Sequence, residues 1–168
     1  MVVDVLPCVL MVAGIPGTGK STFCRFLADR HGFAFYEVDR MPQWQDRAAW
    51  EDLLQRSRSE FVARFRELHP KGAVLEWGFV PEQAPLAREL IGAGMRPIWF
   101  AGDYNRAREL FVARGTVLPD LFDLQVGRIK AADLPQSLPE FQVVCAFRED
   151  RAVRPPEELY AEIFGAGS

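Results

Sequence analysis

The chain has 168 residues, of which 49% are hydrophobic and 26% are charged. Those proportions are ordinary for a globular domain, and the length suffices for one hydrophobic core, so we expect a single domain over residues 1–168. The formal net charge of −3 provides no overall attraction to nucleic acid or to an anionic membrane, and neither partner is expected.

The cysteines and the N-terminal segment indicate the cellular compartment in which the protein is expected to act. The three cysteines, Cys8, Cys24 and Cys145, are far apart and odd in number, which favours reduced, buried thiols in a cytoplasmic protein. The apolar N-terminus carries Asp4 and Pro7 and lacks a basic flank, so we interpret it as the lead-in to a strand and not as a signal peptide. No uncharged apolar run reaches roughly 18 residues, so no membrane span is expected.

Strands alternate with helices along the chain. The predicted elements are, in order, a strand at 8–13, a helix at 20–30, a strand at 33–38, a loop at 40–46, a helix at 48–68, a strand at 73–77, a helix at 82–91, a strand at 97–101, helices at 104–114 and 121–132, a strand at 141–147 and a helix at 156–164. This alternation predicts a three-layer α/β/α fold with a parallel sheet. Ligands of such sheets bind at the carboxyl ends of the strands, so functional residues are expected directly after each strand.

The stretch at residues 14–21, between the first strand and the first helix, fits the P-loop pattern G-x-x-x-x-G-K-[ST] at every fixed position. Glycines let the backbone bend around a phosphate, and the helix that follows points its positive dipole end at the same anion. Lys20 is placed to reach the β- and γ-phosphates, and the Ser21 hydroxyl to ligate Mg²⁺. The predicted nucleotide-binding residues are Gly14, Ile15, Pro16, Gly17, Thr18, Gly19, Lys20, Ser21 and Thr22.

Two carboxylates follow neighbouring strands of the predicted sheet. Asp39 comes after the second strand, where it could accept a proton from a substrate hydroxyl, hold Mg²⁺ through water, or serve only as a turn residue. Glu76 ends an otherwise apolar strand, where a lone charge is costly to bury without a partner. A magnesium ion, a water molecule or an arginine would supply that partner, so we group Glu76 with Ser21 as candidate metal-associated residues.

Aromatic residues beside these carboxylates have two interpretations. Trp77 and Phe79 could form an apolar wall for an organic substrate or pack against the sheet. Trp44, in the loop after Asp39, has the same two interpretations. The candidate substrate-contacting residues are Asp39, Arg40, Trp44, Trp77 and Phe79.

Basic residues are frequent between 106 and 130, namely Arg106, Arg108, Arg114, Arg128 and Lys130. Such residues usually form a solvated helix face, but opposite a P-loop one or two could clamp a phosphoryl group. Arg114 precedes a turn and is best placed for a movable lid, which we expect around residues 114–132.

In this order, the motifs resemble the small P-loop kinases, a group that includes chloramphenicol phosphotransferase, gluconate kinase, shikimate kinase and zeta-toxin-like kinases. The likeness covers most of the chain, through residues 14–21, 38–39, 74–79, 107–114 and 122–125, although only the P-loop is highly specific.

The resemblance implies a P-loop NTPase fold with a five-stranded parallel sheet in the order 2-3-1-4-5. It implies that Asp39 activates the acceptor hydroxyl and that Arg114 is the lid arginine. The chain departs from the group at Glu76, where aspartate is more usual, and at Leu110, where many members carry an earlier lid arginine.

We therefore predict a kinase that uses ATP and Mg²⁺ to phosphorylate a hydroxyl of a small molecule such as an antibiotic or a sugar. Lys20, Asp39 and Arg114 are the expected catalytic residues, and the protein is expected to be a monomer or homodimer. Three alternatives stay open: a kinase of nucleotides or nucleic-acid 5′-hydroxyls, a nucleotide-dependent or toxin-like regulatory switch, and an ATP-binding protein without an acceptor. The sequence specifies neither the acceptor nor a preference between ATP and GTP.

Overall fold

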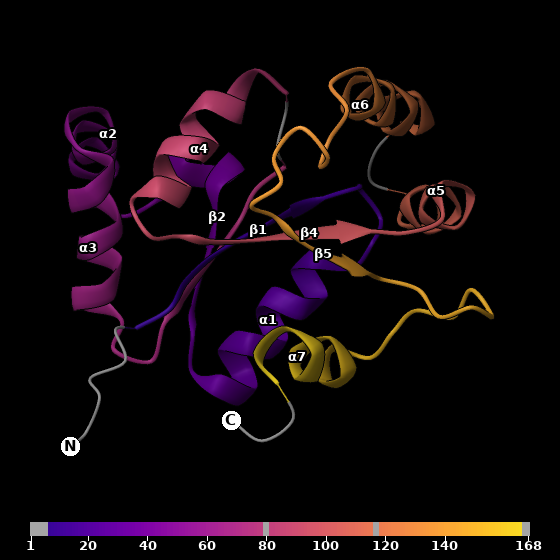
Figure 1. Cartoon of the computed structure of the whole chain (residues 1–168), viewed down its shortest axis with the longest axis horizontal. Helices are drawn as coiled ribbons and strands as arrows, with labels where there is room; N and C mark the ends of the chain where they lie inside the picture. Colours follow the sequence, from indigo (N-terminus) through magenta and orange to yellow (C-terminus); the bar gives the residue numbers. More distant parts are fainter. Residues whose placement is uncertain (1–6, 79–80, 116–117, 166–168) are drawn as a thin grey trace.

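The computed structural model describes residues 7–78, 81–115 and 118–165 (Figure 1). Its elements are β1 (Val9–Gly14), α1 (Lys20–His31), β2 (Ala34–Glu37), η1 (Val38–Gln43), α2 (Arg47–Arg56), α3 (Arg58–Leu68), β3 (Ala73–Glu76), η2 (Pro81–Gln83), α4 (Ala84–Gly92), β4 (Arg96–Ala101), α5 (Tyr104–Ala113), α6 (Pro119–Ala131), β5 (Gln142–Cys145) and α7 (Pro156–Phe164). The predicted alternation of strands and helices is confirmed.

The five strands form one parallel sheet in the order β2-β3-β1-β4-β5, which confirms the expected topology. The central strand, β1, is buried along its whole length. Val12 of β1 and Glu37 of β2 both pair with Glu76 of β3, so β2 and β3 end level with one another while β1 continues for two more residues, to Gly14. The segments that follow them therefore meet at one edge of the sheet.

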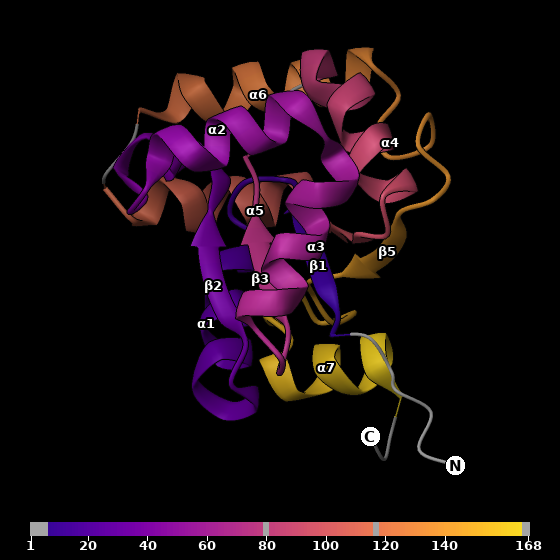
Figure 2. The ribbon, with the colours of Figure 1, turned by 90° about the vertical axis from the view of Figure 1, so that its left-hand side faces the viewer.

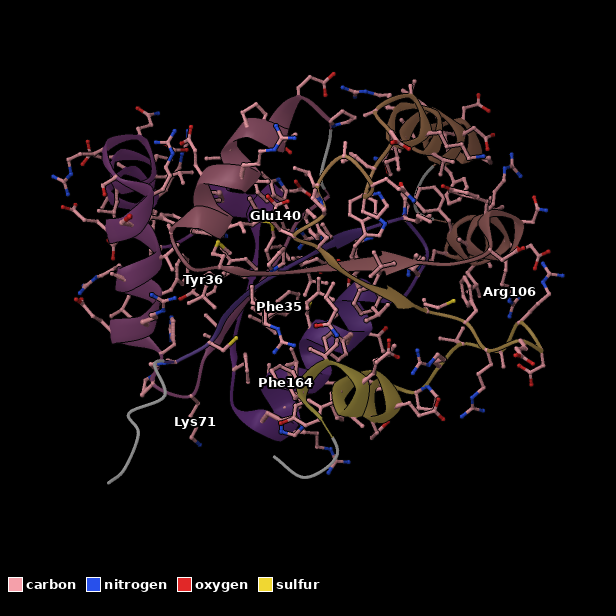
Figure 3. All side chains as sticks on the ribbon, viewed as in Figure 1. Phe35, Tyr36, Lys71, Arg106, Glu140 and Phe164 are labelled. Atoms are coloured by element: carbon pink, nitrogen blue, oxygen red, sulfur yellow. The ribbon has the colours of Figure 1, made fainter. Side chains whose placement is uncertain are left out.

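Side chains alternate between the two faces of the sheet, as extended strands require. Leu10, Val12 and Phe100 pack against α1 and α7, whereas Met11, Ala13 and Trp99 pack against the helices of the opposite face. Phe35 and Tyr36, consecutive in β2, divide between the two clusters in the same way (Figure 3). Figures 1 and 2 show α1 and α7 together on one side of the sheet, with α3 and α4 on the other.

The predicted helix at 48–68 is wrong, because the structure has two helices, α2 and α3, that are interrupted at Ser57. Ser57 has an extended backbone, and its hydroxyl accepts a hydrogen bond of 3.2 Å from the backbone N–H of Glu60. This is one half of a capping box, in which a serine side chain satisfies an N–H that the new helix leaves unbonded. The predicted loop after β2 also differs, because residues 38–43 form the 3₁₀ helix η1.

The three cysteines are free thiols in the structure. Cys24 is buried and Cys8 is partly buried, but Cys145 is exposed, so the expectation of buried thiols is wrong for Cys145. Its place near the end of the edge strand β5 explains the exposure. Among the described residues, no helix has both the length and the apolar character that crossing a membrane would require.

Candidate active site

The P-loop is held in place by close backbone contacts with the elements beside it. Gly14 has a φ of 134°, and a Cβ atom added there would lie 2.3 Å from the carbonyl oxygen of Phe100 in β4. Gly17 has a φ of 77°, and a Cβ atom there would lie 2.3 Å from the carbonyl oxygen of Ala107 in α5. Only glycine combines these left-handed conformations with such close approaches. The buried Thr18 hydroxyl closes the turn by donating a hydrogen bond of 2.6 Å to the carbonyl of Ile15.

Lys20 is the first residue of α1, and its side chain turns back onto the loop. Its Nζ donates hydrogen bonds to the carbonyl oxygens of Ile15, at 3.0 Å, and Gly14, at 3.3 Å. Lys20 as a residue is partly exposed, but its ammonium lies inside the protein, and this burial lowers its pKa from 10.5 to about 8. The carboxylate of Glu76 acts in the opposite direction and favours the charged form.

Ser21 and Glu76 meet beside the P-loop, although 55 positions separate them in the sequence. The Ser21 hydroxyl donates a hydrogen bond of 2.6 Å to Oε1 of Glu76. The other carboxylate oxygen, Oε2, is buried and has no hydrogen-bond partner among the described residues. A buried carboxylate oxygen without a partner calls for a cation or water, and Mg²⁺ binds in nucleotide sites through one or two protein oxygens together with phosphates. The donor set therefore fits a magnesium ion held jointly with a bound nucleotide.

Asp39 lies in the first turn of η1, directly after β2. Its Oδ2 accepts a hydrogen bond of 2.8 Å from the backbone N–H of Gly78, two residues beyond the end of β3. A Cβ atom at position 78 would lie 2.3 Å from the same carboxylate oxygen, so the contact requires glycine or a displaced aspartate. The bond holds the Asp39 carboxylate at the edge where the strands end.

A cavity of about 150 Å³ brings the predicted catalytic residues together. Lys20, Asp39, Glu76 and Arg114 all line it. Arg114 caps the C-terminal end of α5, and its side chain forms no ion pair or hydrogen bond within the part of the chain that the structure describes. The remaining lining residues come from the P-loop, Gly78, α5 and α6, namely Gly14, Pro16, Gly17, Gly78, Phe111, Gln125 and Ile129.

The predicted substrate residues other than Asp39 do not line this cavity. Trp77 is 2% exposed and packs in the core, so of its two interpretations the structure supports packing against the sheet and not a substrate wall. Trp44 is partly buried, stacks edge-on against Tyr36, and donates a hydrogen bond of 3.1 Å to the carbonyl of Glu37. Arg40 is exposed and pairs with Glu37 at 3.3 Å. Phe79 lies outside the described residues.

The other basic residues of the 106–130 segment contact groups outside the cavity. Arg106 lies at the outer edge of α5, beside the segment after β5, and pairs with Glu109 at 3.0 Å (Figure 3). Arg108 donates two hydrogen bonds to the Asp123 carboxylate, at 2.9 and 3.0 Å. Arg128 pairs with Glu82 of η2. Arg114 is therefore the arginine of this segment that the structure places at the P-loop cavity.

The expected lid at 114–132 includes residues 116–117, which lie outside the described residues. The part that is described includes α6, which supplies Gln125 and Ile129 to the cavity. Sequence reasoning did not single out these two residues or Gly78 as site residues. Helical spacing could have paired Gln125 with Ile129, which are four positions apart on α6, but only the tertiary structure shows that this face of the helix meets the P-loop.

No protein-family model and no curated protein matches the sequence. Solved structures do match the fold over nearly the whole chain. A sugar kinase from Janibacter sp. HTCC2649 has a TM-score of 0.58 at 18% identity, with 94% of this chain and 92% of the other covered. A gluconokinase from Sinorhizobium meliloti 1021 has a TM-score of 0.55 at 18% identity, with 94% and 89% covered.

A shikimate kinase from Acinetobacter baumannii, solved in complex with shikimate, has a TM-score of 0.56 at 16% identity, with 95% of this chain and 92% of the other covered. The chain has the fold of the small P-loop kinases. At these identities the likeness shows the fold alone. The chemistry of this chain therefore depends on the residues that line its own P-loop cavity.

Proposed function

We propose that the chain is a kinase that transfers the γ-phosphoryl group of ATP to a hydroxyl of a small molecule. One observation carries this proposal: the P-loop cavity is lined by Lys20, Asp39, Glu76 and Arg114, which come from four different parts of the sequence. Phosphoryl transfer to an alcohol needs cations near the phosphates, a carboxylate that can assist a metal ion and a second carboxylate that can act as base. Lys20 and Arg114 are the cations, and Glu76 and Asp39 are the two carboxylates. The small-molecule kinases that share the fold support the same proposal.

Asp39 is the general base in this mechanism. Its Oδ2 is held by the N–H of Gly78, and its Oδ1 has no hydrogen-bond partner among the described residues, so it can accept the proton of the acceptor hydroxyl. The acceptor oxygen then forms a bond to the γ-phosphorus as the bond to the β-phosphate oxygen breaks, and ADP leaves. The P-loop N–H groups, Lys20 and Arg114 stabilise the charge on the phosphoryl oxygens.

Ser21 and Glu76 would hold the magnesium ion, which supplies charge neutralisation at the β- and γ-phosphates when it is bound. The hydrogen bond between the two side chains orients the Ser21 hydroxyl beside the N-terminus of α1. Glutamate at position 76 is longer than the aspartate common in the group that the sequence resembles. It contacts Ser21 directly, and this contact is compatible with a role next to the metal.

The test is Asp39→Asn, assayed for Mg²⁺-dependent ATP consumption with a panel of sugars, sugar acids, nucleosides and antibiotics. Asparagine keeps the size and one acceptor oxygen but cannot take up the proton, so turnover should fall by about 100-fold or more. The dissociation constant of ATP should change less than about threefold, because Asp39 does not belong to the P-loop. Asp29→Asn, an exposed aspartate on α1, is the matched control and should change neither quantity.

Transfer activity that survives in Asp39→Asn would refute the base assignment. Tight ATP binding by the wild-type protein with no acceptor-dependent turnover would refute the kinase proposal itself.

A further inference from the structure

The turn that carries Asp39 is closed by the side chain of the residue that ends it. The 3₁₀ helix η1 starts directly after Glu37 and ends directly before Trp44. The indole N–H of Trp44 donates a hydrogen bond of 3.1 Å to the carbonyl oxygen of Glu37, and its backbone N–H donates one of 3.0 Å to the carbonyl oxygen of Met41. The side-chain bond therefore joins the two ends of η1 around the proposed base.

The indole of Trp44 is itself held by neighbouring aromatic rings. It meets the ring of Tyr36 edge-on, with 5.0 Å between the centroids, and the rings of Trp50 and Phe65 at 6.0 and 6.3 Å. These three rings belong to β2, α2 and α3. The hydroxyl of Tyr36 is in turn hydrogen-bonded to Nε2 of His69 at 2.8 Å. Because three elements contact the indole, its N–H donor keeps a fixed direction.

Asp39 has few other restraints. Its side chain is exposed, and within the described part of the chain its carboxylate is bonded through Oδ2 to the N–H of Gly78. The ion pair of Arg40 with Glu37, at 3.3 Å, lies at the surface, where such pairs contribute little to stability. The direction of the Asp39 carboxylate thus depends on the backbone of η1, which the indole bond closes.

We propose that Trp44 is a positioning residue, whose indole N–H holds η1 so that the Asp39 carboxylate faces the acceptor hydroxyl. This inference rests on the proposed kinase function and adds to it a residue outside the cavity. Trp44 does not line the P-loop cavity, so it acts on the reaction through Asp39. A tryptophan that only filled the core would contribute through its ring, whereas a positioning residue of this kind contributes through its N–H.

The experiment removes the N–H and keeps the ring. Benzothienylalanine, in which sulfur replaces the indole N–H in a ring system of nearly the same shape, is introduced at Trp44 through a reassigned stop codon. The same replacement at Trp50 is the matched control. Trp50 belongs to the same group of rings, and its indole N–H forms no hydrogen bond with the described residues. Thermal unfolding checks that both variants are folded.

We expect the replacement at Trp44 to lower kcat by about fivefold or more, because a small misplacement of a catalytic group is costly in rate. The KM for ATP should change less than about twofold, and the replacement at Trp50 should change neither constant. In an Asp39→Asn background the replacement at Trp44 should lower kcat no further, since its effect passes through Asp39. An undiminished second loss of kcat in that background would indicate a general structural effect and would overturn the inference.

Exchange of the Gly78 amide proton with solvent is a second measurement, which needs no turnover. The acceptor of this proton is Oδ2 of Asp39, at 2.8 Å, so the exchange rate reports whether the carboxylate is in place. The replacement at Trp44 should speed the exchange by about fivefold, the shift in equilibrium expected from the loss of one neutral hydrogen bond, and the replacement at Trp50 should not.

Gly78 exchange that is unchanged by the replacement at Trp44 would overturn the inference, whatever the kinase assay shows. If the wild-type chain phosphorylated no acceptor, the kinase proposal would fail, and the Gly78 exchange would still decide whether Trp44 holds Asp39 in place.

Discussion

Replacing Lys20 by methionine should change how stability depends on pH. The ammonium of Lys20 has a folded-state pKa of about 8 against an ordinary value of 10.5, and its burial is the main cause. Between these two values the unfolded chain holds the Lys20 proton and the folded chain does not, so the free energy of unfolding rises with pH. Integrating the linkage relation with both pKa values predicts a gain of about 2.5 kcal/mol for the wild-type chain between pH 7 and pH 10.

The assay is urea unfolding of wild type, Lys20→Met and the control Lys71→Met at several values between pH 7 and pH 10. Other titrating groups occur in all three chains, so they cancel when each variant is subtracted from wild type. The wild-type chain should gain about 2.5 kcal/mol relative to Lys20→Met, and Lys71→Met, which removes an exposed lysine far from the P-loop in the sequence, is the control for the loss of one lysine. A difference from Lys20→Met that stays constant within about 0.5 kcal/mol would show that the ammonium is not desolvated in the folded protein.

Three further substitutions test other contacts. Gly78→Ala should displace the Asp39 carboxylate, since the new Cβ would lie 2.3 Å from Oδ2, and should lower kcat by about tenfold or more with ATP affinity unchanged. Arg114→Gln should lower kcat by about 100-fold, while Arg108→Gln, which breaks a surface pair with Asp123, should leave kcat unaltered in the same assay. Ser57→Ala should cost about 1 kcal/mol in urea unfolding by removing the cap of α3, and a loss below about 0.3 kcal/mol would contradict the capping role.

The spacing of apolar residues along the sequence predicted most of the helices and strands, because each element buries one or both of its faces in the core. The alternation of side chains along β3 also bears on Trp77, for which the sequence left two interpretations open. Ala73, Leu75 and Trp77 occupy alternate positions and lie in one core cluster, whereas Val74 lies in the other. Strand alternation alone would have assigned Trp77 to the core. The break at Ser57 also had a local signal, the serine followed three residues later by Glu60.

Two kinds of sequence signal predicted residues of the site. One was the P-loop pattern, and the other was position directly after a strand, which singled out Asp39 and Glu76. The P-loop pattern is recognisable in the sequence because positive φ angles and close backbone contacts require glycine at positions only a few residues apart. The contact between Asp39 and Gly78 joins a side chain to a backbone N–H across 39 positions, and a backbone donor leaves no mark in the sequence. Gln125 and Ile129 depend on how α6 lies over the P-loop, which is a matter of tertiary packing.

The register of β3 links the packing of the core to the chemistry of the site. Glu76 reaches Ser21 because it pairs with Val12 on one side and with Glu37 on the other. A slip of one residue would turn every β3 side chain to the opposite face, which would carry Trp77 to the P-loop side and Glu76 into the apolar cluster. Burial of Trp77, at 2% exposure, opposes that slip, since exposing it would forfeit its core contacts. Trp77 thus supports the proposed metal site from the far face of the sheet, without touching nucleotide or acceptor.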